Sequence, residues 1–211
     1  DIMKSIKDKL TITTYVNLFD EQFFWFHPHN KNYDKERLEK YIRFKPDTKL
    51  KYVYYYAPCD NPSIDEKYPN MTPEEIAKEL CTVHDVKLKD FLNKEQIDKI
   101  IDLKPEKYRC LRTVEDQHGH VEVMRMYNDN QKLPNEEEMS MVFNKFVAQS
   151  PMVAFADGYG ARALDNYGAR GYYLVGHDKW FRHSLYNMGF DVKKLDLDNA
   201  ADYDNVAVLV I

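Results

Sequence analysis

The sequence has few cysteines and no long apolar run. Its three cysteines, Cys59, Cys81 and Cys110, lie far apart and form no CxxC pair, so neither a disulfide framework nor a cysteine-rich zinc site is expected. No stretch approaches the roughly 18 uncharged apolar residues that a membrane-crossing helix needs. The first residues also lack the apolar core of a secretion signal. We therefore expect a cytoplasmic protein with no membrane segment.

A surplus of positive charge is also missing. The 211 residues include 30 Lys and Arg against 35 Asp and Glu, which gives a formal net charge of −5. This balance provides no overall electrostatic attraction for nucleic acid, so a nucleic-acid partner is not expected. With 44% hydrophobic and 31% charged residues, the composition is typical of a folded globular chain.

Glycine is absent from the first half of the chain. The first of the seven glycines is Gly119, and the other six lie within residues 158–189. Glycine permits positive φ angles and close approach of the backbone. Tight turns and any ligand site lined by backbone are therefore predicted in that segment.

Residues 1–71 form the first predicted region, a small α+β extension. β-Branched and aromatic residues predict strands over 9–19 and 49–57. Apolar residues at helical spacing predict a helix over 34–44. A loop containing prolines then ends near residue 71, and we place a domain boundary there, with the second domain over 72–211.

The second region begins with a strong helix-start pattern. Thr72 can cap, Pro73 suits the first helical position, and Glu75 completes a capping box. The elements predicted after it are strands over 81–88, 107–115, 120–128, 139–147, 170–176, 190–197 and 205–211, and helices from 93, over 150–167 and from 178. A rival interpretation divides 150–167 into a strand over 152–156, a turn at Gly158 and a short helix.

This order of elements from residue 81 onward resembles the fold of the GCN5-related N-acetyltransferases. The run from Gly168 to Val175, and the Tyr-x-x-Gly-Phe turn from Tyr186 to Phe190, also resemble motifs of that family. The resemblance implies an α/β protein of the α+β kind. We expect a mixed, mostly antiparallel sheet flanked by helices, preceded by the N-terminal extension.

The resemblance implies transfer of an acetyl group from acetyl-CoA to an amine, on a small molecule or a protein. Tyr186 stands where the family has the general acid that returns a proton to the coenzyme A thiolate. Glu138, with Glu122 as second choice, would be the general base. The residues that the resemblance places at the cofactor are Phe146, Val147, Gln149, Ser150, Met152, Val153, Ala154, Tyr173, Lys179 and Arg182.

One position departs from the phosphate motif of that family. Gln149 and Ala154 fit Arg/Gln-x-x-Gly-x-Gly/Ala, but Met152 occupies the place of the central glycine, and Pro151 lacks an N–H group. Pyrophosphate binding needs exposed backbone N–H groups. A second hypothesis is therefore an acetyltransferase-like protein that binds or assembles without catalysis.

An acidic pattern supports a third hypothesis. Asp196-Leu197-Asp198, together with Asp157, resembles the acidic metal site of topoisomerase–primase domains. Carboxylates at strand ends can hold Mg²⁺ for phosphoryl transfer. This hypothesis, a Mg²⁺-dependent enzyme acting on phosphodiesters, requires residues 152–157 to form a strand.

Two further patterns have structural alternatives. The pairs His27-Pro28-His29 and His118-Gly119-His120 can each share a metal, but neither has an evident third ligand in the sequence, so no metal is expected there. Aromatic residues are dense in the first region, where they either form a core or offer a face to a protein partner. These aromatics are Phe23, Phe24, Trp25, Phe26, Tyr52, Tyr54, Tyr55 and Tyr56.

Overall fold

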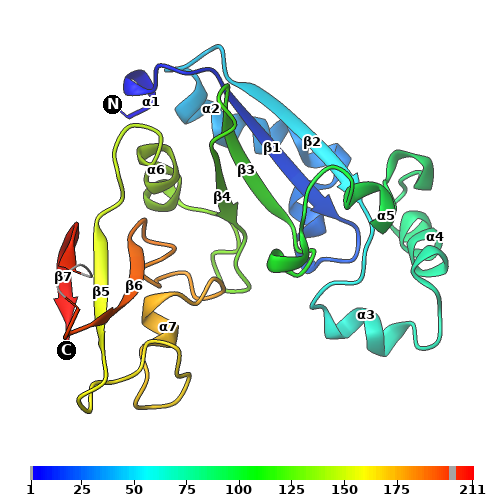
Figure 1. Ribbon diagram of the computed structural model, residues 1–211. Helices are drawn as coiled ribbons and strands as arrows, with labels where there is room; N and C mark the ends of the chain where they lie inside the picture. The colour runs from blue at the N-terminus through cyan, green and yellow to red at the C-terminus, as the bar shows by residue number, and fades with distance from the viewer. Residues whose placement is uncertain (1, 200–202) are drawn as a thin grey trace. The chain divides into compact units, whose positions relative to one another are not determined.

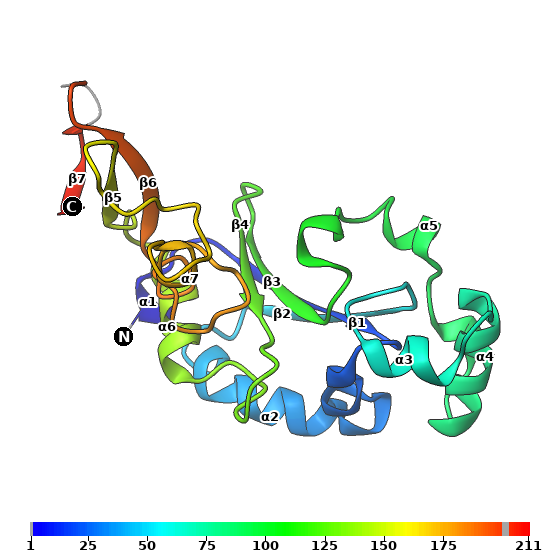
Figure 2. The same ribbon diagram turned by 90° about the horizontal axis from the view of Figure 1, so that it is seen from below.

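The computed structural model describes residues 2–199 and 203–211. Two compact units divide the chain, Met3–Met126 and Tyr127–Ile211. The first contains a four-stranded mixed sheet with helices beside it, and the second contains a smaller sheet of three strands (Figures 1 and 2). The expected α+β class is confirmed.

The sheet of the first unit has the strand order β2-β1-β3-β4. The pairing of β1 with the edge strand β2 is parallel, whereas the pairings of β1 with β3 and of β3 with β4 are antiparallel. The strands are β1 Leu10–Asn17, β2 Lys49–Tyr55, β3 Leu111–Asp116 and β4 Val121–Arg125. All four overlap strands predicted from the sequence.

The helices before residue 127 are short. They are α1 Ile2–Ser5, α2 Lys31–Ile42, α3 Pro62–Lys67, α4 Pro73–Val83 and α5 Lys94–Ile97, with 3-10 turns at Glu21–Phe26, Pro28–Asn30, Leu88–Asp90 and Lys104–Glu106. The predicted capping box is confirmed at α4, where the Thr72 N–H donates to Glu75 Oε2 at 2.8 Å and the Glu75 N–H donates to Thr72 Oγ1 at 3.3 Å. Among the described residues, no helix has both the length and the apolar character needed to cross a membrane.

The predicted strand over 81–88 is wrong. Helix α4 continues to Val83, because Ile76, Leu80 and Cys81 recur at helical spacing and are buried. The apolar residues from Cys81 onward therefore belong to the end of this helix and do not start a strand.

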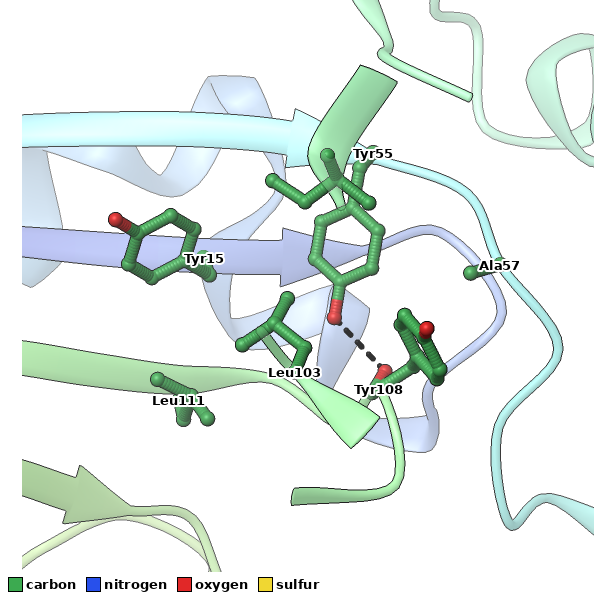
Figure 3. Packing of buried hydrophobic residues seen from close by; sticks show 7 residues of the cluster. Tyr15, Tyr55, Ala57, Leu103, Tyr108 and Leu111 are labelled. Atoms are coloured by element: carbon green, nitrogen blue, oxygen red, sulfur yellow. Dashed lines mark hydrogen bonds between the residues drawn. The ribbon is translucent and has the colours of Figure 1, made fainter. Parts of the chain in front are cut away.

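The two faces of the first sheet bury different kinds of side chains, a polar network on one face and an apolar cluster on the other. On one face, Asp34 of α2 accepts hydrogen bonds from Arg112 and from the Tyr52 hydroxyl, the latter at 2.6 Å. On the other face lies a cluster that includes Tyr15, Tyr55 and Leu111, covered by Ile97 and Leu103 (Figure 3). The predicted tyrosine-rich strand over 49–57 therefore contributes to both faces.

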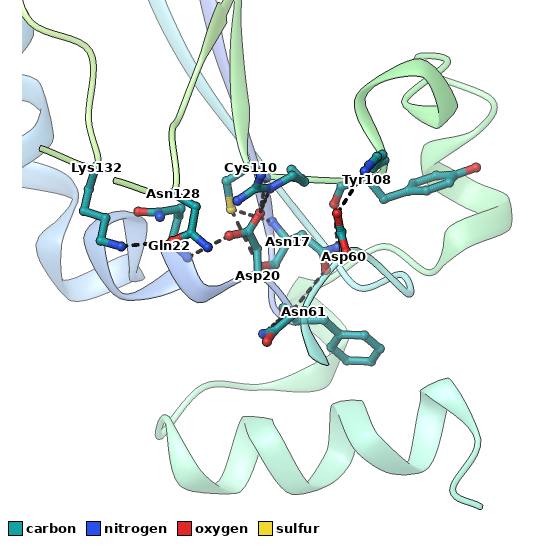
Figure 4. Close-up of polar contacts among 12 residues, drawn as sticks. Asn17, Asp20, Gln22, Asp60, Asn61, Tyr108, Cys110, Asn128 and Lys132 are labelled. Atoms are coloured by element: carbon teal, nitrogen blue, oxygen red, sulfur yellow. Dashed lines mark hydrogen bonds and ion pairs between the residues drawn. The ribbon is translucent and has the colours of Figure 1, made fainter. Parts of the chain in front are cut away.

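Asn17 ties together the ends of three strands. Its Nδ2 donates to the carbonyls of Ala57 at 2.8 Å and Tyr108 at 2.7 Å, and its Oδ1 accepts from the N–H groups of Phe19 and Ala57. Close by, Asp20 Oδ2 accepts from the Cys110 N–H at 2.7 Å (Figure 4). These buried bonds fix the point where β1 and β2 end and β3 begins.

The second unit is built on three parallel strands in the order β6-β5-β7. Its elements are α6 Glu136–Asn144, β5 Met152–Asp157, α7 Tyr173–Gly176, β6 Asp191–Asp196 and β7 Val206–Val210. Val153 and Phe155 of β5 pack with Leu164 in a small buried cluster on one face of this sheet.

Several elements predicted for the second unit are wrong. Residues 139–147 belong to α6 and the turn after it, since Asn135 caps this helix and Met139 and Phe143 bury one face. The helix predicted over 150–167 is wrong, because the segment forms β5 followed by turns. The strand of the rival interpretation, over 152–156, is confirmed. Residues 170–176 hold only the short α7, and turns replace the helix predicted from 178.

The boundary between the compact units differs from the predicted boundary. We expected a division between residues 71 and 72, whereas the units divide after Met126. The reason is strand pairing, because β1 and β2 share one sheet with β3 and β4. A proline-rich loop separates these strands in sequence without separating them in space.

Candidate functional site

The carboxyl ends of β5 and β6 bring two aspartates together. Asp157 ends β5, Asp196 ends β6, and the two residues are register partners in this parallel pair. Register partners on neighbouring strands direct their side chains to the same face of a sheet. Both residues are exposed. Two carboxylates therefore lie side by side at one corner of the sheet.

This corner is also where the strand order reverses. The chain passes from β5 to β6 on one side of β5 and returns to β7 on the other side. In open parallel sheets, ligands bind outside the carboxyl ends of the strands at such a reversal. A pocket of about 560 Å³ is found there, lined by Asp157, Gly158, Tyr159, Lys194 and Asp196.

The backbone after β5 turns sharply. Gly158, Tyr159 and Gly160 have φ angles of 95°, 53° and 80°. Glycine adopts this left-handed region without penalty, whereas a tyrosine there is strained. The two glycines allow the chain to turn directly after Asp157, and Asp157 lines the pocket.

Hydrogen bonds hold one side of the pocket. The Tyr159 hydroxyl donates to Asp198 Oδ2 at 2.5 Å, and the Asp198 N–H donates to Asp196 Oδ1 at 3.0 Å. The bond to Asp198 raises the pKa of the Tyr159 hydroxyl. Within the described ranges, no hydrogen-bond donor contacts the Asp157 carboxylate. Asp198 is thus engaged by Tyr159, and Asp157 faces the pocket.

Lys194 supplies the positive charge of the pocket. It lies two residues before Asp196 on the same face of β6, and its ammonium forms an ion pair with Asp165. That hydrogen bond, with the nearby charges of Asp165 and Asp157, raises the pKa of Lys194. The lysine therefore stays charged beside the carboxylates at neutral pH.

The donor set favours one kind of cation. Among residues 2–199 and 203–211, no group of three or more His, Cys, Asp or Glu side chains is placed to hold a metal ion. A closed zinc site or a calcium cage would require such a group. Mg²⁺, by contrast, keeps several waters and is bound through one or two carboxylates together with substrate phosphates. Asp157 and Asp196 fit that mode.

The sequence hypothesis included Asp157, Asp196 and Asp198 but missed Tyr159 and Lys194. Lys194 had a usable signal, because residues i and i+2 of a strand share a face. Tyr159 had a weaker signal, since it stands between two glycines and therefore at a turn. The register that brings Asp157 beside Asp196 depends on pairing between strands almost 40 residues apart, which local sequence does not reveal.

The predicted phosphate motif lies in and just before β5. Gln149 and Ser150 precede the strand, Met152 begins it, and Val153 and Ala154 are buried in it. Because β5 is the central strand and pairs with both β6 and β7, its N–H groups are directed toward neighbouring strands. They do not form the exposed helix start that the acetyltransferase resemblance implied, and acetyl-CoA binding stays a prediction.

The other predicted cofactor and acid residues are dispersed in the second unit. Phe146 and Val147 follow α6, so they do not lie on the predicted strand. Tyr173 begins α7, where its ring stacks on Tyr167 with centroids 3.7 Å apart. Tyr186 is half-buried, with the Lys145 ammonium 5.8 Å from its ring centroid. Lys179, also half-buried, lies in the turns after α7.

Glu138 and Arg182 do come together, in a buried ion-pair network. Arg182 Nη1 donates to Glu138 Oε2 at 2.5 Å, Arg182 Nε donates to Asp129 Oδ2 at 2.6 Å, and the guanidinium lies 4.3 Å from the Tyr127 ring centroid. Burial raises the pKa of Glu138, whereas Arg182 lowers the pKa of Asp129 to about 2. Arg182 is therefore engaged by two carboxylates rather than directed at a nucleotide phosphate. Asp129 was not among the residues predicted from the sequence.

The remaining candidates lie in the first unit. Glu122, on β4, contacts His120 Nε2 at 3.1 Å through its Oε1. Of the aromatics from Phe23 to Phe26, Phe23 and Phe26 are buried and belong to the core. Phe24 and Trp25 are 64% and 44% exposed, and thus accessible to a partner.

Comparison with known proteins gives no relative. No family model, curated protein sequence or solved structure matches the chain. What the chain can do is therefore inferred from its own side chains.

Proposed function

We propose that the second unit binds a divalent cation, Mg²⁺ or Mn²⁺, at Asp157 and Asp196 and acts on phosphodiesters. The observation that supports this most is the register pairing of the two aspartates at the carboxyl ends of adjacent parallel strands. The pocket over them and the charged Lys194 are consistent with a substrate that carries phosphate.

Each group has a chemical role in this proposal. Asp157 and Asp196 would hold the cation, which supplies Lewis-acid polarisation of a phosphoryl oxygen when bound. Lys194, as a compact ammonium, would attract and orient a phosphate oxygen. Tyr159 forms a hydrogen bond with Asp198, and Asp198 is not assigned to the cation.

The first test is cation binding measured by calorimetry and by thermal unfolding in Mg²⁺ or Mn²⁺. A ligand at ten times its dissociation constant stabilises the folded state by about 1.4 kcal/mol. We expect such a shift for the natural chain and its loss in Asp157→Asn and Asp196→Ala. Asp191→Asn is the matched control, because Asp191 is an exposed aspartate at the other end of β6.

The second part of the test is hydrolysis of a phosphodiester reporter with and without a chelator. Activity that needs Mn²⁺ or Mg²⁺, survives Asp191→Asn and disappears in Asp196→Ala supports the proposal. A chain that binds neither cation, or binds equally well without Asp157 and Asp196, contradicts it. Stabilisation by acetyl-CoA instead would favour the acyltransferase hypothesis, and an effect of neither ligand would favour the non-catalytic one.

Other expectations from the sequence stay predictions. They include the cytoplasmic location, the amine acceptor and a protein partner for the N-terminal aromatics. Exposure of Phe24 and Trp25 is consistent with such a partner.

A further inference from the structure

A four-residue sequence occurs twice in the segment between β5 and α7. Tyr159-Gly160-Ala161-Arg162 recurs identically as Tyr167-Gly168-Ala169-Arg170, and we call these the first and the second YGAR repeat. The segment follows the carboxyl end of β5, and its Tyr159 lines the candidate pocket (Figure 1). Each repeat carries one aromatic ring and one guanidinium.

The tyrosines and arginines of both repeats are exposed to solvent. Tyr159 is 77% exposed and Tyr167 is 70% exposed, and both Arg162 and Arg170 are exposed as well. Tyrosine side chains are on average only partly exposed, so two exposed rings at the same position of a repeat are unusual. The Tyr173 ring covers one face of Tyr167, which leaves the other face open.

The backbone brings the ends of the two repeats side by side. Ala163 and Gly171, the residues directly after each repeat, pair in a parallel β-bridge, and the Tyr172 N–H donates to the Ala163 carbonyl at 3.0 Å. Since Arg162 and Arg170 each precede a bridge partner, they lie on neighbouring backbone segments. The repeat in sequence is therefore matched by equivalent positions in space.

The positive charge of the repeats has no carboxylate partner in the described part of the chain. Neither Arg162 nor Arg170 forms an ion pair there, and the Arg162 guanidinium lies 5.9 Å from the Tyr172 ring centroid. Asp165, the carboxylate between the repeats, is paired with Lys194 instead. Like charges on neighbouring segments repel each other, and a bound anion would offset that repulsion.

Side-chain contacts connect the second repeat with the candidate cation site. Lys194 lines the pocket and forms its ion pair with Asp165. Asp165 Oδ1 in turn lies 3.5 Å from His177 Nε2. The His177 ring contacts the Tyr173 ring with centroids 4.8 Å apart, and Tyr173 stacks on Tyr167. Both repeats thus border the same site.

We propose that the two YGAR repeats bind single-stranded nucleic acid, with a base stacked on each tyrosine and a phosphate held by each arginine. Successive nucleotides repeat a base and a phosphate, which matches the repetition of ring and guanidinium. A single strand is favoured over a duplex, because only unstacked bases offer their faces to aromatic side chains. The proposal rests on the proposed function and names its substrate class.

The overall charge of −5, which argued against a nucleic-acid partner, does not oppose this local contact. At physiological ionic strength, exposed charges separated by more than about 8 Å are largely screened from each other. The arginines at the strand therefore outweigh distant carboxylates, and stacking does not depend on charge.

The test is fluorescence anisotropy with labelled single strands of about 15 nucleotides, as DNA and as RNA, and with the duplex of the same sequence, all in a chelator. We expect a single strand to bind more tightly than the duplex, and the tighter of DNA and RNA identifies the sugar. Tyr167→Ala should raise the dissociation constant about tenfold through loss of one stacked base. Tyr167→Phe keeps the ring and should bind like the natural chain.

The arginines have a separate readout in the salt dependence of binding. Arg162→Ala and Arg170→Ala should each reduce the slope of log K against log salt by about 0.7, the value of one phosphate contact to a single strand. Tyr33→Ala is the matched control for the ring, because Tyr33 on α2 is also 70% exposed. Arg43→Ala, an exposed arginine directly after α2, is the control for charge.

Binding to no strand, a preference for the duplex, or an equal loss in Tyr33→Ala would each overturn the proposal. Because the chelator removes divalent cations, this measurement is independent of the cation site. A strand that binds while calorimetry shows no cation binding would refute only the proposed function, and the reverse result would refute only the strand contact.

Discussion

Arg182 is the most heavily engaged residue of the second unit. Its guanidinium is buried, forms ion pairs with Glu138 and Asp129, and lies over the Tyr127 ring. Removal of one member of a buried ion pair leaves its partner charged without compensation, which costs about 3–5 kcal/mol. The arginine is therefore central to the stability of this unit.

We expect Arg182→Ala to lower the free energy of unfolding by about 3–5 kcal/mol near neutral pH, because Glu138 would remain buried without its counter-charge. Urea unfolding followed by circular dichroism measures the loss. Arg170→Ala is the control, since Arg170 is exposed. Equal effects of the two substitutions would contradict the assigned role.

The effect should depend on pH in a defined direction. Arg182 lowers the pKa of Asp129 from its usual 3.8 to about 2 in the folded chain. A depressed carboxyl pKa contributes stability above the unfolded value, and that contribution is lost as the pH falls through the folded value. The difference between the natural chain and Arg182→Ala should therefore shrink between about pH 4 and pH 2.

At the scale of elements, strand β5 shows what local sequence cannot settle. The run from Met152 to Ala156 is apolar, and a short apolar run suits a buried strand and a buried helix equally. Its partners β6 and β7 follow tens of residues later, and pairing with them decides the outcome. Helix α6 was missed for a different reason, because its signal was the cap at Asn135 together with Met139 and Phe143 rather than β propensity.

Other elements were predictable because their signals are local. The capping box at Thr72 and the alternating tyrosines of β2 needed no distant partner. The acidic corner was half predictable, since the aspartates were visible in the sequence while their alignment was not.

Gly171 belongs to the turns between β5 and β6, where backbone packs closely. A Cβ atom at Gly171 would lie 1.8 Å from the Asn166 carbonyl oxygen, so Gly171→Ala forces the backbone to move. Such overpacking typically costs about 1–3 kcal/mol. Thermal unfolding of the variant measures the loss.

The control for this prediction is Gly168→Ala, three residues away. There the added Cβ would meet only the side-chain amide of Asn166, at 3.2 Å, and a side chain can rotate. We expect this variant to unfold close to the natural chain. If both variants were equally stable, the tight turn around Gly171 would not be present.

At the scale of the whole molecule, each compact unit has its own sheet and its own buried cluster. In the described part of the chain, the two sheets are separate and each lies within one unit. We therefore expect calorimetry to resolve two unfolding transitions, and Arg182→Ala to lower only one of them. A single transition that shifts as a whole in this variant would show that the units unfold together.

The pairing of β1 has a consequence for synthesis of the chain. This strand lies at the centre of its sheet, yet its antiparallel partner β3 begins about 100 residues later at Leu111. Translation proceeds from the N-terminus at about 5–20 residues per second. For several seconds the nascent β1 therefore has no β3 to form hydrogen bonds with. We therefore expect the incomplete first unit to be accessible to ribosome-associated chaperones during that period.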